Sequence, residues 1–101
     1  MDLFVYGTLM DDALVVELTG RSFRKERARL PGYRKVTPEG DYPYIVPDPA
    51  QTVEGLVLRD VDDEALRVFD VYEDERLYVR REVTVTIAGD RQICIAYVRR
   101  S

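Results

Sequence analysis

Glu73 is the side chain in this sequence best suited to acid–base chemistry. It ends a segment in which apolar residues recur with the period of a helix, and at about 100° per residue it shares a stripe with Leu66, Phe69 and Tyr72. Burial on that stripe and the negative end of the helix dipole would both raise the pKa of its carboxyl. Such a group suits proton transfer near neutral pH. Fraying of the helix end, which would turn Glu73 into water, is an equally weighted alternative.

The turn formed by Tyr6, Gly7, Thr8 and Leu9 is the second candidate. It follows a short apolar run and precedes a helical pattern, so the amides of Thr8, Leu9 and Met10 could point to one spot and attract a carboxylate, a phosphate or an oxyanion. Strand–glycine–helix turns are mostly structural, and this one is too short for a dinucleotide or P-loop pattern. We therefore expect no nucleotide site.

Composition excludes several kinds of chemistry. The 101 residues contain no histidine and one cysteine, Cys94. A Ser-His-Asp triad, a Cys-His dyad, an intramolecular disulfide and nearly every zinc site are thereby excluded. Cys94 lies in an apolar strand pattern and is expected to be structural. We expect no metal and no cofactor, so acid–base chemistry must come from Asp, Glu, Tyr, Lys or Cys.

The charge balance bears on partners and location. With 15 basic and 19 acidic side chains, the net charge of −4 disfavours nucleic acid and anionic membranes as partners. Basic residues cluster over 21–29, where we favour a solvated strand face over a phosphate-contacting stripe, because no aromatic residues interleave. No apolar run approaches the ~20 residues of a membrane span, and the first residues do not form a secretory signal. A cytoplasmic location is expected.

The periodicity predicts a single α+β domain over 1–101, with a small mixed sheet of five to six strands curled into a barrel and two flanking helices. Helices are expected at 10–18 and from Asp60 or Asp62 to Tyr72 or Asp74. Strands are expected at 3–6, 23–30, 44–46, 53–59, 77–88 and 93–98. Pro31-Gly32 should end the second strand, and Gly89-Asp90 should form the turn of the last hairpin.

Two smaller interpretations complete this pattern. The segment Tyr42-Pro43-Tyr44-Ile45-Val46-Pro47 is mostly loop, with aromatic rings that could wall a pocket or pack over an open barrel end. On the second helix, charged residues collect on one flank, which we interpret as solvated: Asp63, Arg67, Asp70 and Asp74.

Six segments together resemble the γ-glutamylcyclotransferase-like family, which includes the AIG2-like proteins and γ-glutamylamine cyclotransferase. They are FVYGTL (4–9), ARLPGYRK (28–35), YPYIVP (42–47), VEGLVL (53–58), LRVFDVYEDERLYVRREV (66–83) and IAYV (95–98). They span nearly the whole chain. YGTL after the first strand, combined with FDVYE and the following Tyr78-x-Arg80, is specific as a set.

The resemblance implies a small barrel and an enzyme that releases an amine or amino acid from a γ-glutamyl amide, leaving 5-oxoproline. Glu73 aligns with the family's catalytic glutamate, the general acid/base, and residues 6–9 align with its substrate-cradling loop. Tyr97 corresponds to a pocket residue. Asp74 departs from the pattern, because many relatives have glycine after the glutamate.

This chemistry suits the composition, because the substrate's own α-amine is the nucleophile and the protein need not supply one. A non-catalytic module that binds a small carboxylate or a partner is the alternative. Retention of both Glu73 and the YGTL turn favours the enzyme. The acidic balance disfavours a third interpretation, an RNA-binding barrel. Neither the leaving amine nor the oligomeric state is indicated.

Overall fold

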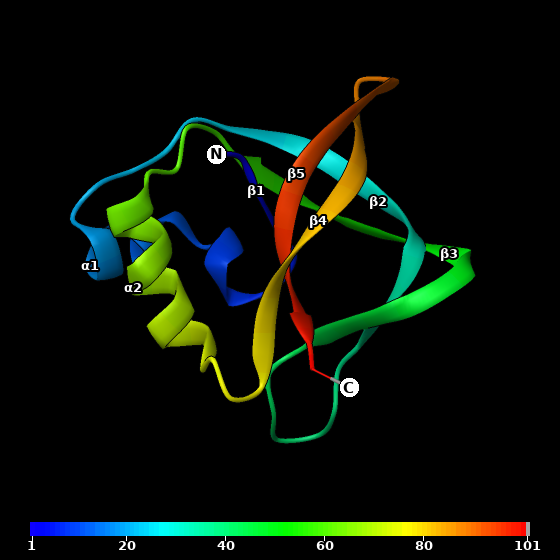
Figure 1. The fold of residues 1–101 in the computed structure, drawn as a ribbon, viewed down its shortest axis with the longest axis horizontal. Helices are drawn as coiled ribbons and strands as arrows, with labels where there is room; N and C mark the ends of the chain where they lie inside the picture. The colour runs from blue at the N-terminus through cyan, green and yellow to red at the C-terminus, as the bar shows by residue number, and fades with distance from the viewer. Residues whose placement is uncertain (101) are drawn as a thin grey trace.

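The computed structural model describes residues 1–100, and within them five strands form one closed barrel in the order β1-β3-β2-β4-β5 (Figure 1). The strands are β1 (Leu3–Val5), β2 (Lys25–Val36), β3 (Tyr44–Leu58), β4 (Tyr78–Ile87) and β5 (Asp90–Arg99). A 3-10 turn, η1 (Thr8–Met10), and the helices α1 (Asp12–Thr19) and α2 (Asp63–Glu73) complete the chain. The predicted α+β fold is confirmed.

Strand β1 closes the barrel, because it pairs antiparallel with β3 and parallel with β5. Its side chains alternate between two hydrophobic clusters. Phe4 lies in the cluster of strand residues inside the barrel, whereas Leu3 and Val5 lie in the cluster that includes both helices. Figure 1 shows these helices together on one side of the barrel, beside β1. The loop that follows β1 therefore starts where barrel and helices meet.

Gly55 of β3 directly precedes the residues that pair antiparallel with β1, and the β1 backbone lies close to it. A Cβ atom at this position would stand 2.2 Å from the carbonyl oxygen of Val5 and 2.8 Å from Cζ of Phe4. Only glycine allows the two backbones to approach this far. The glycine of the VEGLVL segment thus serves barrel closure.

Strands β2 and β3 are longer than the sequence pattern predicts. β2 continues beyond Pro31-Gly32, with a bulge at Gly32 (φ 86°), and residues 48–51 of β3 lie opposite this bulge without register partners. The expected short strands at 44–46 and 53–59 are two parts of β3. Strand β4 pairs with β2 at Arg29 alone, so most of the outer edge of β2 lacks a strand partner. Proline is tolerated at such an edge because no neighbouring strand needs its missing N–H.

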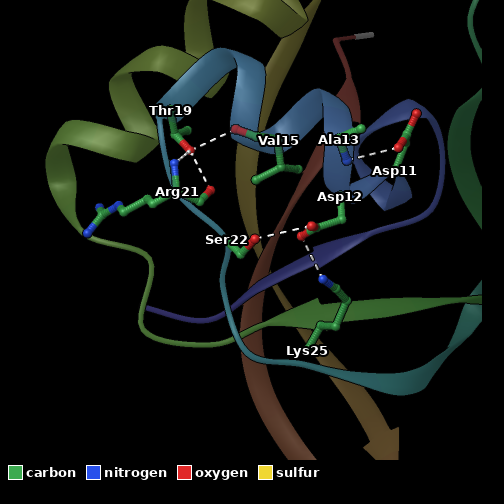
Figure 2. Close-up of polar contacts among 8 residues, drawn as sticks. All are labelled: Asp11, Asp12, Ala13, Val15, Thr19, Arg21, Ser22 and Lys25. Carbon is green, nitrogen blue, oxygen red and sulfur yellow. Dashed lines mark hydrogen bonds and ion pairs between the residues drawn. The ribbon is translucent and has the colours of Figure 1, made fainter.

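Helix α1 begins at Asp12, later than predicted, because Met10 belongs to the preceding 3-10 turn. Figure 2 shows how the helix is bounded: the Asp11 carboxylate accepts from the Ala13 amide (3.0 Å), and the Thr19 hydroxyl donates to the Val15 carbonyl (2.7 Å). Gly20, with φ 80°, ends it.

Helix α2 and the last hairpin follow the predicted pattern closely. The Asp62 carboxylate accepts from the Ala65 amide and caps α2, which buries Ala65, Leu66 and Phe69. The hairpin turn lies at Ala88-Gly89 rather than at the predicted Gly89-Asp90. Ala88 and Gly89 both adopt the positive φ that a type I′ turn requires.

Three residues of the basic cluster at 21–29 form ion pairs with acidic partners: Arg21 with Asp62, Lys25 with Asp12 and Arg29 with Glu54. Much of this positive charge is therefore compensated locally. Among the described residues, no helix combines the length and the apolar character needed to cross a membrane.

Candidate active site

A cavity of about 70 Å³ opens where β1, α2 and the loop before β3 meet. The residues that line it come from four stretches of the chain and include every site residue proposed from the sequence. They are Phe4, Val5, Tyr6, Gly7, Thr8, Leu9, Tyr42, Pro43, Tyr72, Glu73 and Tyr97.

Glu73 is the last residue of α2 and is partly buried in the cavity wall. The helix does not fray before it, so Glu73 lies on the inner side as the helical spacing predicts. Burial raises the pKa of its carboxyl to about 7, and within residues 1–100 no hydrogen bond opposes this shift. At neutral pH the group is therefore poised between its charged and neutral forms.

Asp74 ends α2 in the conformation that glycine adopts readily. Its φ is 65°, and its amide donates to the Val71 carbonyl oxygen. Its carboxylate accepts from the amide and guanidinium of Arg76, and these bonds lower the pKa of Asp74. The aspartate thus ends the helix with a positive φ, the backbone conformation that glycine favours.

The loop over residues 6–9 forms the opposite wall. The Met10 amide donates to the Gly7 carbonyl (3.0 Å). The sequence suggested that this amide could bind a ligand, but the bond to Gly7 makes it unavailable. The Thr8 and Leu9 amides belong to the first turn of η1 and have no partner within it. A Cβ at Gly7 would stand 3.1 Å from Cγ of Pro43, so the glycine lets the proline-rich segment wall the cavity.

Tyr6 joins this loop to the barrel. Its hydroxyl donates to the Tyr97 carbonyl oxygen (2.6 Å), and its own carbonyl accepts from the Lys35 ammonium (3.1 Å). Burial, followed by the negative charge of Glu73, raises the pKa of the Tyr6 hydroxyl well above its usual value. Tyr6 therefore remains neutral and acts as a hydrogen-bond donor.

Tyr97 lines the cavity, but its hydroxyl is committed to α2. It donates to the Asp70 carboxylate (2.6 Å), which also pairs with the Arg80 guanidinium (3.1 Å). The prediction that Asp70 lies on a solvated flank is wrong, because its side chain is 13% exposed. Both partners come from the final hairpin, so helical periodicity could not reveal them.

Tyr72 is a site residue that the sequence reasoning placed on the apolar stripe but not in the site. Its hydroxyl and the Thr8 hydroxyl form a hydrogen bond of 2.7 Å that joins α2 to η1. Its position next to Glu73 was the available signal. Within residues 1–100, no group of acidic or sulfur side chains is arranged to hold a metal ion.

The fold and the site define the class of the chain: a small closed α+β barrel with two helices on one side, whose cavity holds a partly buried carboxylate and a glycine turn. The sequence pattern of the family described as "Gamma-glutamyl cyclotransferase, AIG2-like" matches residues 3–101, and the chain belongs to this family. The resemblance inferred from the motifs is thus confirmed.

Curated relatives agree with this assignment. The chain is 37% identical to AIG2-like protein C of Arabidopsis thaliana over 87 residues, covering 85% of this chain and 50% of that protein. It is 31% identical to a protein of Methanocaldococcus jannaschii named gamma-glutamylcyclotransferase and putative RNase, over 98 residues, covering 96% and 44%. The chain spans about half the length of the curated relatives it matches.

Solved structures share the fold. A solution structure of an Arabidopsis thaliana protein superposes with a TM-score of 0.88 at 28% identity, covering 97% of this chain and 67% of that chain. A structure titled gamma-glutamyl cyclotransferase gives a TM-score of 0.83 at 20% identity, covering 100% and 67%, which supports the fold alone.

Proposed function

We propose that this protein cyclises a γ-glutamyl amide, releasing an amine or amino acid and 5-oxoproline, with Glu73 as general base and then general acid. The observation that carries the proposal is the partly buried carboxylate of Glu73, whose pKa of about 7 suits it to both roles. Family membership supports the same class of reaction.

The proton transfers balance around Glu73. Its carboxylate takes a proton from the substrate's α-ammonium, and the freed amine attacks the γ-carbonyl carbon to form the ring C–N bond. The bond from this carbon to the amide nitrogen then breaks as that nitrogen takes the proton from Glu73. Glu73 next removes the second proton from the ring nitrogen, which leaves the lactam N–H of 5-oxoproline, and passes it to the released amine, which departs as an ammonium ion. Both reacting groups belong to one folded substrate chain, so a high effective molarity assists the attack.

The loop residues and the tyrosines would hold the substrate in this folded form. The Thr8 and Leu9 amides, together with that of Gly7, would donate to the α-carboxylate or to the developing oxyanion. Tyr6 and Tyr97 would form the wall behind the substrate, since their hydroxyls bond to the protein rather than point freely into the cavity.

A screen of γ-glutamyl compounds for 5-oxoproline release tests this proposal. Glu73→Gln keeps the size of the side chain but cannot accept the proton, so we expect turnover to fall ~10²–10⁴-fold. The exposed Glu82 on β4 provides the matched control, since Glu82→Gln should leave the rate unchanged. Parental turnover by Glu73→Gln would exclude Glu73 as the base. Binding of γ-glutamyl compounds by the parent without turnover would instead establish the non-catalytic module.

A further inference from the structure

A shallow groove runs from the mouth of the cavity along α1. Cavity and groove share Gly7, Thr8, Tyr42 and Tyr72, so the two spaces adjoin, with the hydrogen-bonded Thr8 and Tyr72 hydroxyls at their boundary. A substrate seated against Glu73 and the loop over residues 6–9 would extend through this shared mouth. The groove shares more lining residues with the cavity than the other surface hollows do, so it is the candidate space for whatever is attached to the γ-glutamyl group.

The floor of the groove is apolar near the cavity. Met10 of η1 and Ala13 and Leu14 of α1 line it beyond the shared mouth. Glu17 lines it one turn further, about 6 Å along the helix axis from Ala13, because residues four apart share a helix face. An extended chain of several methylenes would span this apolar stretch and bring its end near Glu17.

The charge of the groove is negative. No lysine or arginine is among its described lining residues, and its two carboxylates belong to Asp11 and Glu17. Asp11 is occupied in capping α1, where it accepts from the Ala13 amide. Glu17 is exposed and takes part in none of the ion pairs among residues 1–100, so its charge is available to a ligand.

We propose that this groove binds the leaving amine, and that it selects an amine with an apolar stem that ends in a second cationic group and bears no carboxylate. The stem packs against Met10 and Leu14, and the cation lies near Glu17. A leaving group with a carboxylate at that end is repelled by the same side chain. This inference rests on the proposed cyclisation.

Three γ-glutamyl amides with the same stem of four methylenes test the selection: those of 1,4-diaminobutane, pentylamine and 5-aminopentanoate, which end in a cation, a methyl group and an anion. We expect kcat/KM to fall in that order, with about tenfold between the first and the last, as suits an exposed ionic contact. The preference should shrink as salt is added.

Variants at Glu17 assign the preference to the groove. Glu17→Gln should bring the cationic amide down to the level of the neutral one, and Glu17→Lys should reverse the order. The control Glu82→Gln should keep the parental order. Equal kcat/KM for all three amides, or an order that persists in Glu17→Lys, would overturn the groove assignment while leaving the cyclisation intact.

Binding separates failure of the groove from failure of the reaction. Calorimetric titration of the Glu73→Gln variant with the same three amides measures their affinities, and thereby the preference of the groove, without turnover. The same order of affinities supports the groove even where no 5-oxoproline is released by the parent. Equal affinities overturn the groove, and no measurable binding of any amide overturns both proposals.

Discussion

At the scale of single residues, the property that suits Glu73 to proton transfer also weakens the fold. The carboxyl has a pKa of about 7 in the folded chain and 4.5 as its ordinary value, so between these values the folded state binds more protons than the unfolded state. The contribution of Glu73 to stability is therefore highest below pH 4.5 and is lost as the pH rises toward 7. Above pH 7 the charged form remains at a constant disadvantage.

We expect Glu73→Gln to be more stable than the parent at pH 8, by about 2 kcal/mol, because the amide carries no charge to desolvate. At pH 4 the carboxyl is neutral in both states, and the difference should nearly vanish. Urea denaturation of both proteins at the two pH values measures this. An equal difference at pH 4 and pH 8 would show that packing, not ionisation, separates the variants.

In the proposed reaction, the same pKa would set the pH dependence of turnover. Since the base must be ionised, kcat/KM should rise tenfold per pH unit on the acid side and level off above about pH 7. A pH profile with any accepted γ-glutamyl amide gives this limb directly. A limb near 4.5 would mean that the carboxyl is solvated when the free enzyme binds substrate.

At the scale of elements, one polar contact anchors α2 on the barrel. Asp70 receives the Tyr97 hydroxyl of β5 and pairs with Arg80 of β4, so it ties the helix that carries Glu73 to both strands of the final hairpin. Asp70 lies one turn before Glu73, so in the proposed reaction it would position Glu73 rather than take part in the chemistry.

We expect Asp70→Asn to destabilise the protein by about 1–2 kcal/mol, because both bonds to the carboxylate are charge-assisted. Turnover should fall further in Asp70→Asn than in Tyr97→Phe, since Arg80 loses its charged partner only in the Asp70 variant. A double-mutant cycle of Asp70→Asn with Tyr97→Phe, followed by thermal unfolding, measures the coupling. Strictly additive losses of stability would show that the two side chains act separately.

The elements also show what sequence periodicity can predict. Helix α2 was predictable through Glu73, because its apolar stripe and its Asp62 cap are local signals. The lengths of β2 and β3 were not predictable. Pro31-Gly32 and the prolines after Ile45 indicate the end of a strand unless the strand edge is known to be unpaired. Contacts such as Asp70 with Tyr97 join residues 27 apart, beyond the reach of any period.

At the scale of the whole molecule, closure of the barrel and formation of the site depend on the same close contact between β1 and Gly55 of β3. Val5, which would collide with a Cβ at Gly55, directly precedes the loop that faces Glu73. The site residues come together because the topology brings β1, the end of α2 and β5 to one place. The motifs indicated which residues would meet, but no local sequence pattern indicated the close contact between β1 and β3.

We expect Gly55→Ala to destabilise the barrel by about 1–3 kcal/mol or more, because the nearest contact is backbone and cannot rotate away. Affinity for γ-glutamyl compounds should fall with stability, since the displaced strand carries the loop. Urea denaturation and calorimetric titration measure the two effects. Gly89→Ala, in the exposed hairpin turn, is the comparison that strains a positive φ without blocking the contact between β1 and β3. Unchanged stability in Gly55→Ala would show that β1 can shift without loss.

The three-residue strand β1 has a consequence for biosynthesis. Its parallel neighbours on β5 are Ile95 and Ala96, which are translated some ninety residues after Leu3 and Phe4. On a ribosome-bound chain β1 can pair with β3, but its other edge has no strand partner until the final hairpin has emerged, and only then can the pocket be complete. A nascent chain stopped before residue 95 has the Tyr6–Leu9 loop but lacks the strand beside it, so we expect such intermediates to expose an apolar strand edge and to retain no ligand.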